Sequence, residues 1–417
     1  MHEWPVLYFY SGVKDFTAND SGKFVHYDEL AGNVKGDTGI EGLKIDFNAG
    51  VRVAVPAGNW HIKITDAESG QVFFDDKVSE KILISMEQYF ICWQIDVFKD
   101  DVLVFSHTYD AVGQVVCFVL EGNVLGDKIM LLPYIRAFLN KWQCNGVVLD
   151  DLVFREILAN YYPELKIVDS IPDDAYATYH VGAFQTPPFL LPDDSRTLAI
   201  ENIGQELLGL STATEDVRYS PTNPREIPEP YVCIAVQASG ARKCWLYPQG
   251  WEEVTDYLKR LGYRVICIDR ESVTESDGVR IEMPSGAEDM SGDYTLMDRV
   301  NMLAYADFFI GLPSGLSWLA HAAGCPVVLI SGITLPHSEF ATPYRIQNRQ
   351  VCHGCYNDLR VDWRNDKCPY HKGTERELEC SKKITPQMVI GIIERLLQDK
   401  QKNGEKDGER TTGIAGV

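Results

Sequence analysis

The sequence is poor in basic residues. Of its 417 residues, 39 are Lys or Arg and 60 are Asp or Glu, which gives a formal net charge of −21. A surface with this balance repels phosphate backbones and anionic lipid headgroups. We therefore expect neither nucleic acid nor a membrane surface as a partner, and an anionic ligand needs a local site.

The sequence also lacks the features of membrane-inserted and exported proteins. No apolar run is long enough to span a bilayer, and the opening MHEWPVLYFYSGVKDF lacks the basic, apolar and cleavage segments of a signal peptide. The eleven cysteines are an odd number. Seven of them lie mostly in apolar, strand-like surroundings, where a reduced thiol behaves as a small hydrophobe. These features predict a protein of a reducing cytoplasm rather than one held by disulfides.

The pattern of apolar residues divides the chain into successive parts. Short, evenly spaced β-type runs fill residues 40–120 and predict a small antiparallel barrel or sandwich, to which we assign residues 1–110. Strands and helices then alternate, which predicts an α/β fold with two parallel-sheet domains at 111–225 and 226–350. The Pro-rich stretch RYSPTNPREIPEPY is the expected linker between them. A ligand cleft is expected at the carboxyl ends of the strands.

Four cysteines gather in a polar, loop-like stretch. Cys352 and Cys355 form a C-x2-C pair, and Cys368 and Cys380 follow at wider spacing. Such a stretch cannot build a core of its own, and four thiolates suit a closed, structural metal site holding Zn or Fe. Two disulfides or free thiols are the alternative. Two nearby histidines are further possible ligands: His353 and His371. We assign this finger and a closing helix to 351–397, and expect the polar, Gly-rich tail 398–417 to be disordered.

Residues that suit a diphosphate and its nucleoside follow three strands of the second α/β domain. Ser314 and Gly315 open a helix directly after the strand DFFIG, where unpaired N–H groups attract anions. Lys243 follows the domain's first strand and would act as a point cation. Glu288 and Asp289 lie in another loop and could accept from ribose hydroxyls or an adenine amino group. Simple helix capping, a solvated surface lysine and an acidic turn are the respective alternatives.

A carboxylate candidate lies in the first α/β domain. Asp127 follows the strand QVVCFVL and a Gly-containing turn, at the start of a helix expected to begin at Lys128. It suits a general base that takes a proton from a hydroxyl attacking a sugar's anomeric carbon, although Asp is also a favoured N-cap. Asp110, beside His107, is the second candidate, for which a turn role is the alternative.

Two motifs resemble the heptosyltransferases that use ADP-heptose. These are the LGD-x5-P motif (Leu125, Gly126, Asp127, Pro133) and the stretch IGLPSGLSWLAHAAGCPVVLISG from Ile310. The cysteine stretch, the preceding TLPHSEFATPYR and the β-rich start narrow the resemblance to the bacterial autotransporter heptosyltransferases. It extends from about residue 24 to 395.

The resemblance implies a fold of the GT-B type, with an acceptor-side Rossmann-like domain (111–225) and a donor-binding one (226–350). It implies inverting transfer of heptose from ADP-heptose to serine hydroxyls of an adhesin passenger domain, by a cytoplasmic bacterial enzyme that forms a large homo-oligomer, a dodecamer. The implied roles are Asp127 as base, Lys243 as donor ligand, and the segment Ser314, Gly315 and Leu316 as diphosphate site. Iron would be held by Cys352, Cys355, Cys368 and Cys380, with zinc as the alternative.

One motif differs from the corresponding motif of the lipopolysaccharide heptosyltransferases. Their Asp-Thr-Gly-Leu-x-His reads Pro313-Ser314-Gly315-Leu316-Ser317-Trp318 here, so Trp318 replaces the histidine. This favours a protein acceptor over lipopolysaccharide core. A heptosyltransferase that nevertheless acts on that core is the second hypothesis, and a non-catalytic carbohydrate-binding scaffold with a metal ribbon is the third.

Overall fold

The chain folds into two compact α/β units. The computed structural model describes residues 6–10, 13–14, 34–85, 90–120, 124–149, 154–182, 194–210, 217–276, 278–362 and 368–412. The first unit comprises 1–123, 130–195 and 201–215, and the second comprises 124–129, 196–200 and 216–417. Within the described ranges, no helix combines the length and the apolarity that a bilayer crossing requires.

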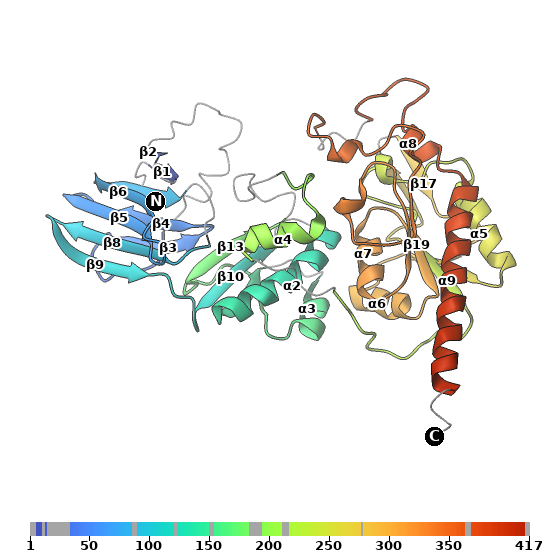
Figure 1. Cartoon of the computed structure of the whole chain (residues 1–417), viewed down its shortest axis with the longest axis horizontal. Helices are drawn as coiled ribbons and strands as arrows, with labels where there is room; N and C mark the ends of the chain where they lie inside the picture. Colours follow the sequence, from blue (N-terminus) through green and yellow to red (C-terminus); the bar gives the residue numbers. More distant parts are fainter. Residues whose placement is uncertain are drawn as a thin grey trace. The chain divides into compact units, whose positions relative to one another are not determined.

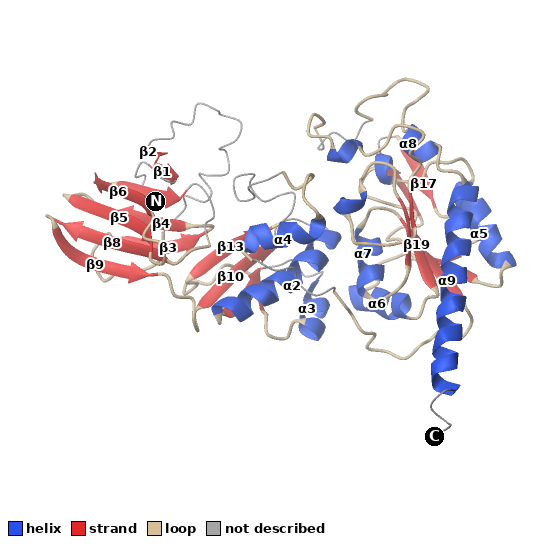
Figure 2. Ribbon diagram, viewed as in Figure 1, coloured by secondary structure: helices blue, strands red, loops and turns tan. Residues whose placement is uncertain are grey.

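The first unit is built on two sheets, drawn as red arrows in Figure 2. Its strands are β1 (Val6–Tyr10), β2 (Val13–Lys14), β3 (Lys44–Asn48), β4 (Val51–Val55), β5 (Trp60–Asp66), β6 (Val72–Val78), β7 (Lys81–Ser85), β8 (Trp93–Lys99), β9 (Val102–Thr108), β10 (Val115–Leu120), β11 (Asn145–Leu149), β12 (Lys166–Val168) and β13 (Ala177–Val181). Its helices are α3 (Arg155–Tyr161), α4 (Ile200–Leu208) and most of α2 (Leu125–Trp142). They lie beside β10 and β13 in Figure 1.

The smaller sheet has four antiparallel strands in the order β6-β5-β8-β9. In β5 and β8, buried and half-exposed residues alternate along the strand, because successive side chains point to opposite faces. The buried residues are Trp60, Ile62, Ile64, Trp93, Ile95 and Val97. The predicted antiparallel strands are therefore confirmed.

The larger sheet crosses the predicted boundary at residue 110. Its order is β12-β11-β10-β13-β3-β4-β7-β1-β2. The pairings from β12 to β3 are parallel, whereas β3, β4 and β7 pair in antiparallel fashion. The described strands of residues 1–110 thus do not form a barrel or sandwich apart from the first α/β domain. The reason is that β3 hydrogen-bonds to β13 and extends the parallel sheet sideways.

The second unit contains a six-stranded parallel sheet. Its strands are β14 (Tyr231–Ile234), β15 (Arg264–Cys267), β18 (Glu288–Asp289), β19 (Phe308–Gly311), β20 (Val327–Ile330) and β21 (Arg345–Ile346), beside the separate hairpin β16 (Val273–Ser276) and β17 (Val279–Glu282). Its helices are α5 (Gly250–Arg260), α6 (Leu296–Ala304), α7 (Gly315–Ala322), α8 (Glu379–Lys382) and α9 (Pro386–Thr412), with short 3-10 turns η3 (Ala241–Lys243), η4 (Pro336–Ser338) and η5 (Cys355–Asn357). In Figure 1, α6 and α7 lie on one side of this sheet and α5 and α9 on the other.

The strand order of this sheet is that of the Rossmann fold. The order β18-β15-β14-β19-β20-β21 corresponds to 3-2-1-4-5-6 along the chain, and each pairing is parallel. Local sequence sets the helix that precedes β19: Thr295 and Asp298 cap α6 reciprocally, each side chain accepting from the other's backbone N–H. The alternation of strands and helices predicted for this half is therefore confirmed.

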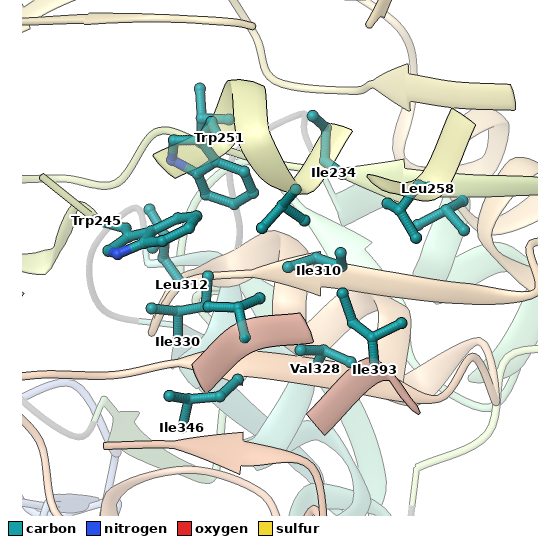
Figure 3. Packing of buried hydrophobic residues seen from close by; sticks show 14 of the residues in the cluster. Ile234, Trp245, Trp251, Leu258, Ile310, Leu312, Val328, Ile330, Ile346 and Ile393 are labelled. Carbon is teal, nitrogen blue, oxygen red and sulfur yellow. The ribbon is translucent and has the colours of Figure 1, made fainter. Parts of the chain in front are cut away.

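An apolar cluster supports the sheet of the second unit. Figure 3 shows the side chains of Ile310 and Val328, from neighbouring strands, near Ile393 of α9, and Ile234 of β14 belongs to the same cluster. Trp245 and Trp251 pack edge to face at 5.2 Å between ring centroids, and Trp245 donates to the carbonyl of Ile384. Ile384 and α9 therefore belong to this core, whereas Cys355 and Cys380 pack with Ile333 in a separate small cluster.

Two further boundaries differ from the predictions. The longest segment of the second unit begins at Asp216 rather than at 226. The Pro-rich linker belongs to it because the N–H groups of Thr222 and Asn223 donate to Asn301 of α6 at 2.7 and 3.1 Å. α9 continues to Thr412, so the expected disorder from residue 398 is wrong up to that point. Its Lys, Glu and Gln residues are good helix formers and extend a helix already anchored on the core. Residues 413–417 lie outside the described ranges.

Candidate active site and metal centre

The donor-site candidates lie at the switch point of the second sheet. β14 and β19 are neighbours, and the chain leaves them for β15 and β20, in opposite directions along the sheet. Ligands of such sheets bind where the strand order reverses, outside the carboxyl ends of the strands. The loop after β14 carries Lys243 in η3, and the loop after β19 carries Ser314. The structure thus brings these two predicted residues to the same edge.

Ser314 occupies the N-cap position of α7, but its side chain makes no capping hydrogen bond. Ser317 instead donates its hydroxyl to the carbonyl of Leu312 at 2.6 Å. Ser314, Gly315 and Leu316 are all partly exposed. Simple side-chain capping, the alternative for Ser314, is therefore not what the structure shows.

Asp127 lies in the first turn of α2, which is grouped with the second unit. The helix begins at Leu125, three residues before the predicted start, so Asp127 is a helical residue and not the N-cap. The preceding turn, residues 121–123, lies outside the described residues. A Cβ on Gly126 would come within 2.6 Å of the Trp318 ring, and one on Gly315 within 2.5 Å of the Leu125 Cβ. Both glycines permit this close packing, and Trp318 is the residue that departs from the lipopolysaccharide motif.

The Asp127 carboxyl is buried, with 8% of the residue exposed. Burial raises its pKa from 3.8 to about 7, and the charge of Lys243 opposes this rise. A carboxyl with a pKa near neutrality can both accept and release a proton under physiological conditions. The position of Asp127 beside the lysine is therefore suited to acid–base chemistry next to an anion.

Sequence reasoning missed a second buried carboxylate near Lys243. Glu339 is 6% exposed and pairs with Arg345 at 2.5 Å. Burial raises its pKa, while Arg345 and, more weakly, Lys243 lower it. Arg345 also donates to Ser331 and to the carbonyl of Thr334, both after β20. The sequence offered one sign of this pair: Glu339 stands six positions before Arg345 in TLPHSEFATPYR. Whether the two side chains meet, however, depends on how the loop folds.

Glu288 and Asp289 lie on the edge strand β18 and have protein partners. Glu288 accepts two hydrogen bonds from Arg264, at 2.8 and 2.6 Å. Asp289 accepts from the backbone and the hydroxyl of Ser291. Both residues are exposed. Their role in nucleoside binding stays a prediction.

The second carboxylate candidate has a local role. Asp110 accepts from the N–H of Val112 at 3.0 Å, which is a turn interaction. His107 lies 2.9 Å from the Tyr176 hydroxyl, and burial lowers its pKa. These contacts belong to the first unit and match the turn alternative.

The four clustered cysteines line one pocket of the second unit. They are not joined as disulfides. Burial and the neighbouring thiols raise the pKa of Cys380 to about 12 and that of Cys355 to about 11. The donor set suits a thiophilic ion, which would displace the thiol protons on binding. The residues therefore fit a structural metal.

A different ligand set lies in the same pocket. Among the described residues, the group whose ligand atoms all lie within 4.8 Å of one another is Cys352, His371 and Glu379. Glu379 also accepts from the N–H of Cys352 and pairs with Arg376. His371, one of the two alternative ligands named from the sequence, belongs to this group, whereas His353 lines the pocket without joining it. Ligation by four cysteines stays a prediction.

Comparison with known proteins identifies the family. The family model "Glycosyltransferase TibC, N-terminal domain" matches residues 39–101, and "Glycosyltransferase family 9 (heptosyltransferase)" matches 201–368. The autotransporter heptosyltransferase BAHTCr of Citrobacter rodentium is 39% identical, over 88% of this chain and 92% of the relative. This chain belongs to the autotransporter heptosyltransferases. It is therefore a glycosyltransferase.

Other members and their structures give further comparisons. The autotransporter heptosyltransferase TibC of Escherichia coli is 38% identical, over 88% of this chain and 92% of the relative. Its crystal structure, described as a bacterial iron-containing dodecameric glycosyltransferase, has a TM-score of 0.82 and covers 88% of this chain and 98% of that one. A second TibC structure is described as a complex with ADP-D-beta-D-heptose, with a TM-score of 0.80 and coverage of 86% and 96%. BimC of Burkholderia thailandensis, named an inactive autotransporter heptosyltransferase, is 31% identical over 85% of this chain and 86% of the relative.

Proposed function

We propose that this chain transfers heptose from ADP-heptose to serine hydroxyls of an autotransporter passenger domain, with inversion. The observation that carries the proposal is the buried Asp127 carboxyl, whose pKa is raised to about 7, beside Lys243 at the switch point of a Rossmann sheet. The complex of TibC with ADP-D-beta-D-heptose supports the choice of donor, and the names of the relatives support the acceptor.

In the proposed mechanism Asp127 is the general base. Its carboxylate takes the proton from a serine hydroxyl while the serine oxygen forms a bond to the anomeric carbon of the heptose. The bond from that carbon to the β-phosphate oxygen breaks, and ADP leaves with the electron pair. Attack from the face opposite to the leaving group inverts the anomeric configuration.

Positive charge near the leaving group lowers the barrier to ADP departure. Lys243 supplies a cation, and the backbone N–H groups at Ser314, Gly315 and Leu316 begin α7 with no intrahelical acceptor. Preorganised donors of this kind stabilise charge that develops in the transition state. Ser314 is a partly exposed residue whose side chain makes no capping bond, and its hydroxyl adds a further donor.

The cysteine cluster has a structural role in this proposal. Cys352, Cys355, Cys368 and Cys380 would hold iron, as the description of TibC supports, with zinc as the alternative. The ion would stabilise the polar stretch 351–380 and takes no part in transfer. We further propose a GT-B arrangement of two Rossmann-like domains, a dodecamer like that of TibC, and a cytoplasmic site of action, where thiols remain reduced.

Mass spectrometry of an intact passenger domain tests this function. Co-expression with the wild-type chain should add increments of one heptose, whereas co-expression with Asp127→Asn should add none. Purified lipopolysaccharide core offered in parallel tests the second acceptor, which Trp318 in place of the motif's histidine disfavours. Failure to release ADP from ADP-heptose with either acceptor would indicate a non-catalytic scaffold, and would place the chain with BimC.

A further inference from the structure

Two adjacent cationic residues face two different clusters. Arg242 and Lys243 are consecutive in the 3-10 turn η3. Arg242 is 6% exposed and lines the pocket of the four cysteines. Lys243 lies near the carboxyls of Asp127 and Glu339, whose pKa values it lowers. Successive side chains of a 3-10 turn point about 120° apart, so one short turn can serve both clusters.

The turn is bonded to the segment that carries the last cysteine. The N–H groups of Lys243 and Cys244 close the turn on Gly240 and Ala241, each at 3.0 Å. Ser381, which follows Cys380, donates to the carbonyl of Cys244 at 2.5 Å and accepts from the N–H of Leu246 at 2.8 Å. The backbone that presents Lys243 is therefore held by the cysteine segment.

The loop that leads to Glu339 is held by the cysteine segment as well. Gly354 and Tyr356 donate their N–H groups to the carbonyls of Gly332 and Ile333, each at 3.0 Å. The side chain of Asn357 accepts from the N–H of Leu335 at 2.8 Å. Lys243 and Glu339 thus both belong to segments that are hydrogen-bonded to the cysteine segment.

We propose that Arg242 is a positioning residue that couples the metal centre to the donor site. Four thiolates around a divalent or trivalent ion carry a net negative charge, which attracts the Arg242 guanidinium. With Arg242 held in the pocket, η3 is fixed and Lys243 is directed toward the donor diphosphate. The inference rests on the proposed function for the identity of that ligand, but the fixing of η3 does not depend on it.

The test compares metal-loaded wild type with Arg242→Gln and Arg242→Lys. Arg376→Gln is the matched control, because Arg376 lines the same pocket but lies on the finger's own loop and pairs with Glu379. Three quantities are measured: metal content with its thiolate-to-metal absorption, amide hydrogen exchange of residues 240–246, and the Kd for ADP by calorimetry.

We expect Arg242→Gln to keep its metal, exchange residues 240–246 faster, and bind ADP at least about fivefold more weakly, the lower end of typical coupling between sites. Arg242→Lys keeps the charge without the planar fork and should give an intermediate Kd. Arg376→Gln should leave the exchange of 240–246 and the Kd at wild-type values.

The coupling would be overturned if amide hydrogen exchange of residues 240–246 were as slow in Arg242→Gln as in the wild type. An unchanged Kd, or loss of metal from both Arg242 variants, would also overturn it, because the proposal places Arg242 outside the ligand set. A wild-type protein that does not bind ADP would instead refute the donor assignment, and the exchange of 240–246 alone would then decide the inference. If Arg242→Gln does not fold, Arg242→Lys decides it.

Discussion

The raised pKa of Asp127 predicts how transfer depends on pH. In the proposed reaction the base must be ionised, and burial places its pKa near 7. Roughly a tenth of such a group is ionised at about pH 6 and roughly nine tenths at about pH 8, so kcat/KM should rise about tenfold between them. Initial rates of ADP release from about pH 5 to about pH 9 measure this directly.

The same shift predicts a stability change in Asp127→Asn. The folded pKa lies above the unfolded value, so between about pH 4 and pH 7 the folded chain holds a proton that the unfolded chain has released. Stability therefore falls as pH rises through this window, and a rise from 3.8 to about 7 corresponds to about 4 kcal/mol at most. The neutral, isosteric Asn does not ionise, so we expect the variant to be inactive but to melt higher than wild type at about pH 8, with the gain vanishing near pH 4.

Asp110→Asn is the matched control, because Asp110 is an exposed turn residue of the first unit. It should keep the wild-type rate profile and show no comparable gain in melting temperature. A wild-type rate that is flat through pH 7, together with a melting difference for Asp127→Asn that does not vary with pH, would refute the assignment of the base. The calculation depends on the burial of Asp127, so the same result would also refute that burial in solution.

Three further substitutions test the surroundings of the base, and a fourth, in α9, serves as a control. Lys243→Met removes the cation that lowers the aspartate's pKa, so the rate profile should shift to higher pH and KM for the donor should rise; an unshifted profile would contradict the contact. Glu339→Gln leaves the Arg345 guanidinium without its counter-charge and should lower the free energy of unfolding by about 3–5 kcal/mol, measured by thermal unfolding. A decrease below about 1 kcal/mol would mean that the Glu339–Arg345 pair is solvated in solution. Gly126→Ala should abolish transfer, because the added methyl would meet the Trp318 ring at 2.6 Å. Gly391→Ala, in the open interior of α9, is the control and should instead stabilise the folded chain by about 0.5–1 kcal/mol. Equal effects of the two substitutions on transfer and stability would show that the close packing at Gly126 is unimportant.

Local patterns in the sequence predicted the elements well, because period and turn residues are local properties. The alternation in β5 gave its buried face, and the run DFFIG before Ser314 gave β19 and the start of α7. Pairing between distant strands is not local. Nothing in LKIDF indicates that β3 bonds to β13, more than a hundred residues later, and so the boundary at residue 110 could not be foreseen.

The candidate site was likewise predicted in its local features but not in its contacts between distant residues. Residue type and position after a strand selected Asp127 and Lys243, and the structure places them together. Their environment could not be predicted, because the start of α2 packs against residues that are distant in sequence, as Gly126 does against Trp318. Glu339 was missed for this reason: a loop carboxylate becomes a buried partner of Arg345 only once the chain folds back on itself.

The merging of β3, β4 and β7 with the parallel strands limits how this enzyme can be divided. A chain shortened to begin at residue 111 would retain β13 but expose the edge that β3 now covers, along with the apolar faces of the removed strands. Uncovered edges of this kind promote aggregation. Genetic dissection of the catalytic half should therefore keep the first hundred residues, and exchanges between homologous enzymes need to move 124–129 and 196–200 together with 216–417, because these segments form one unit.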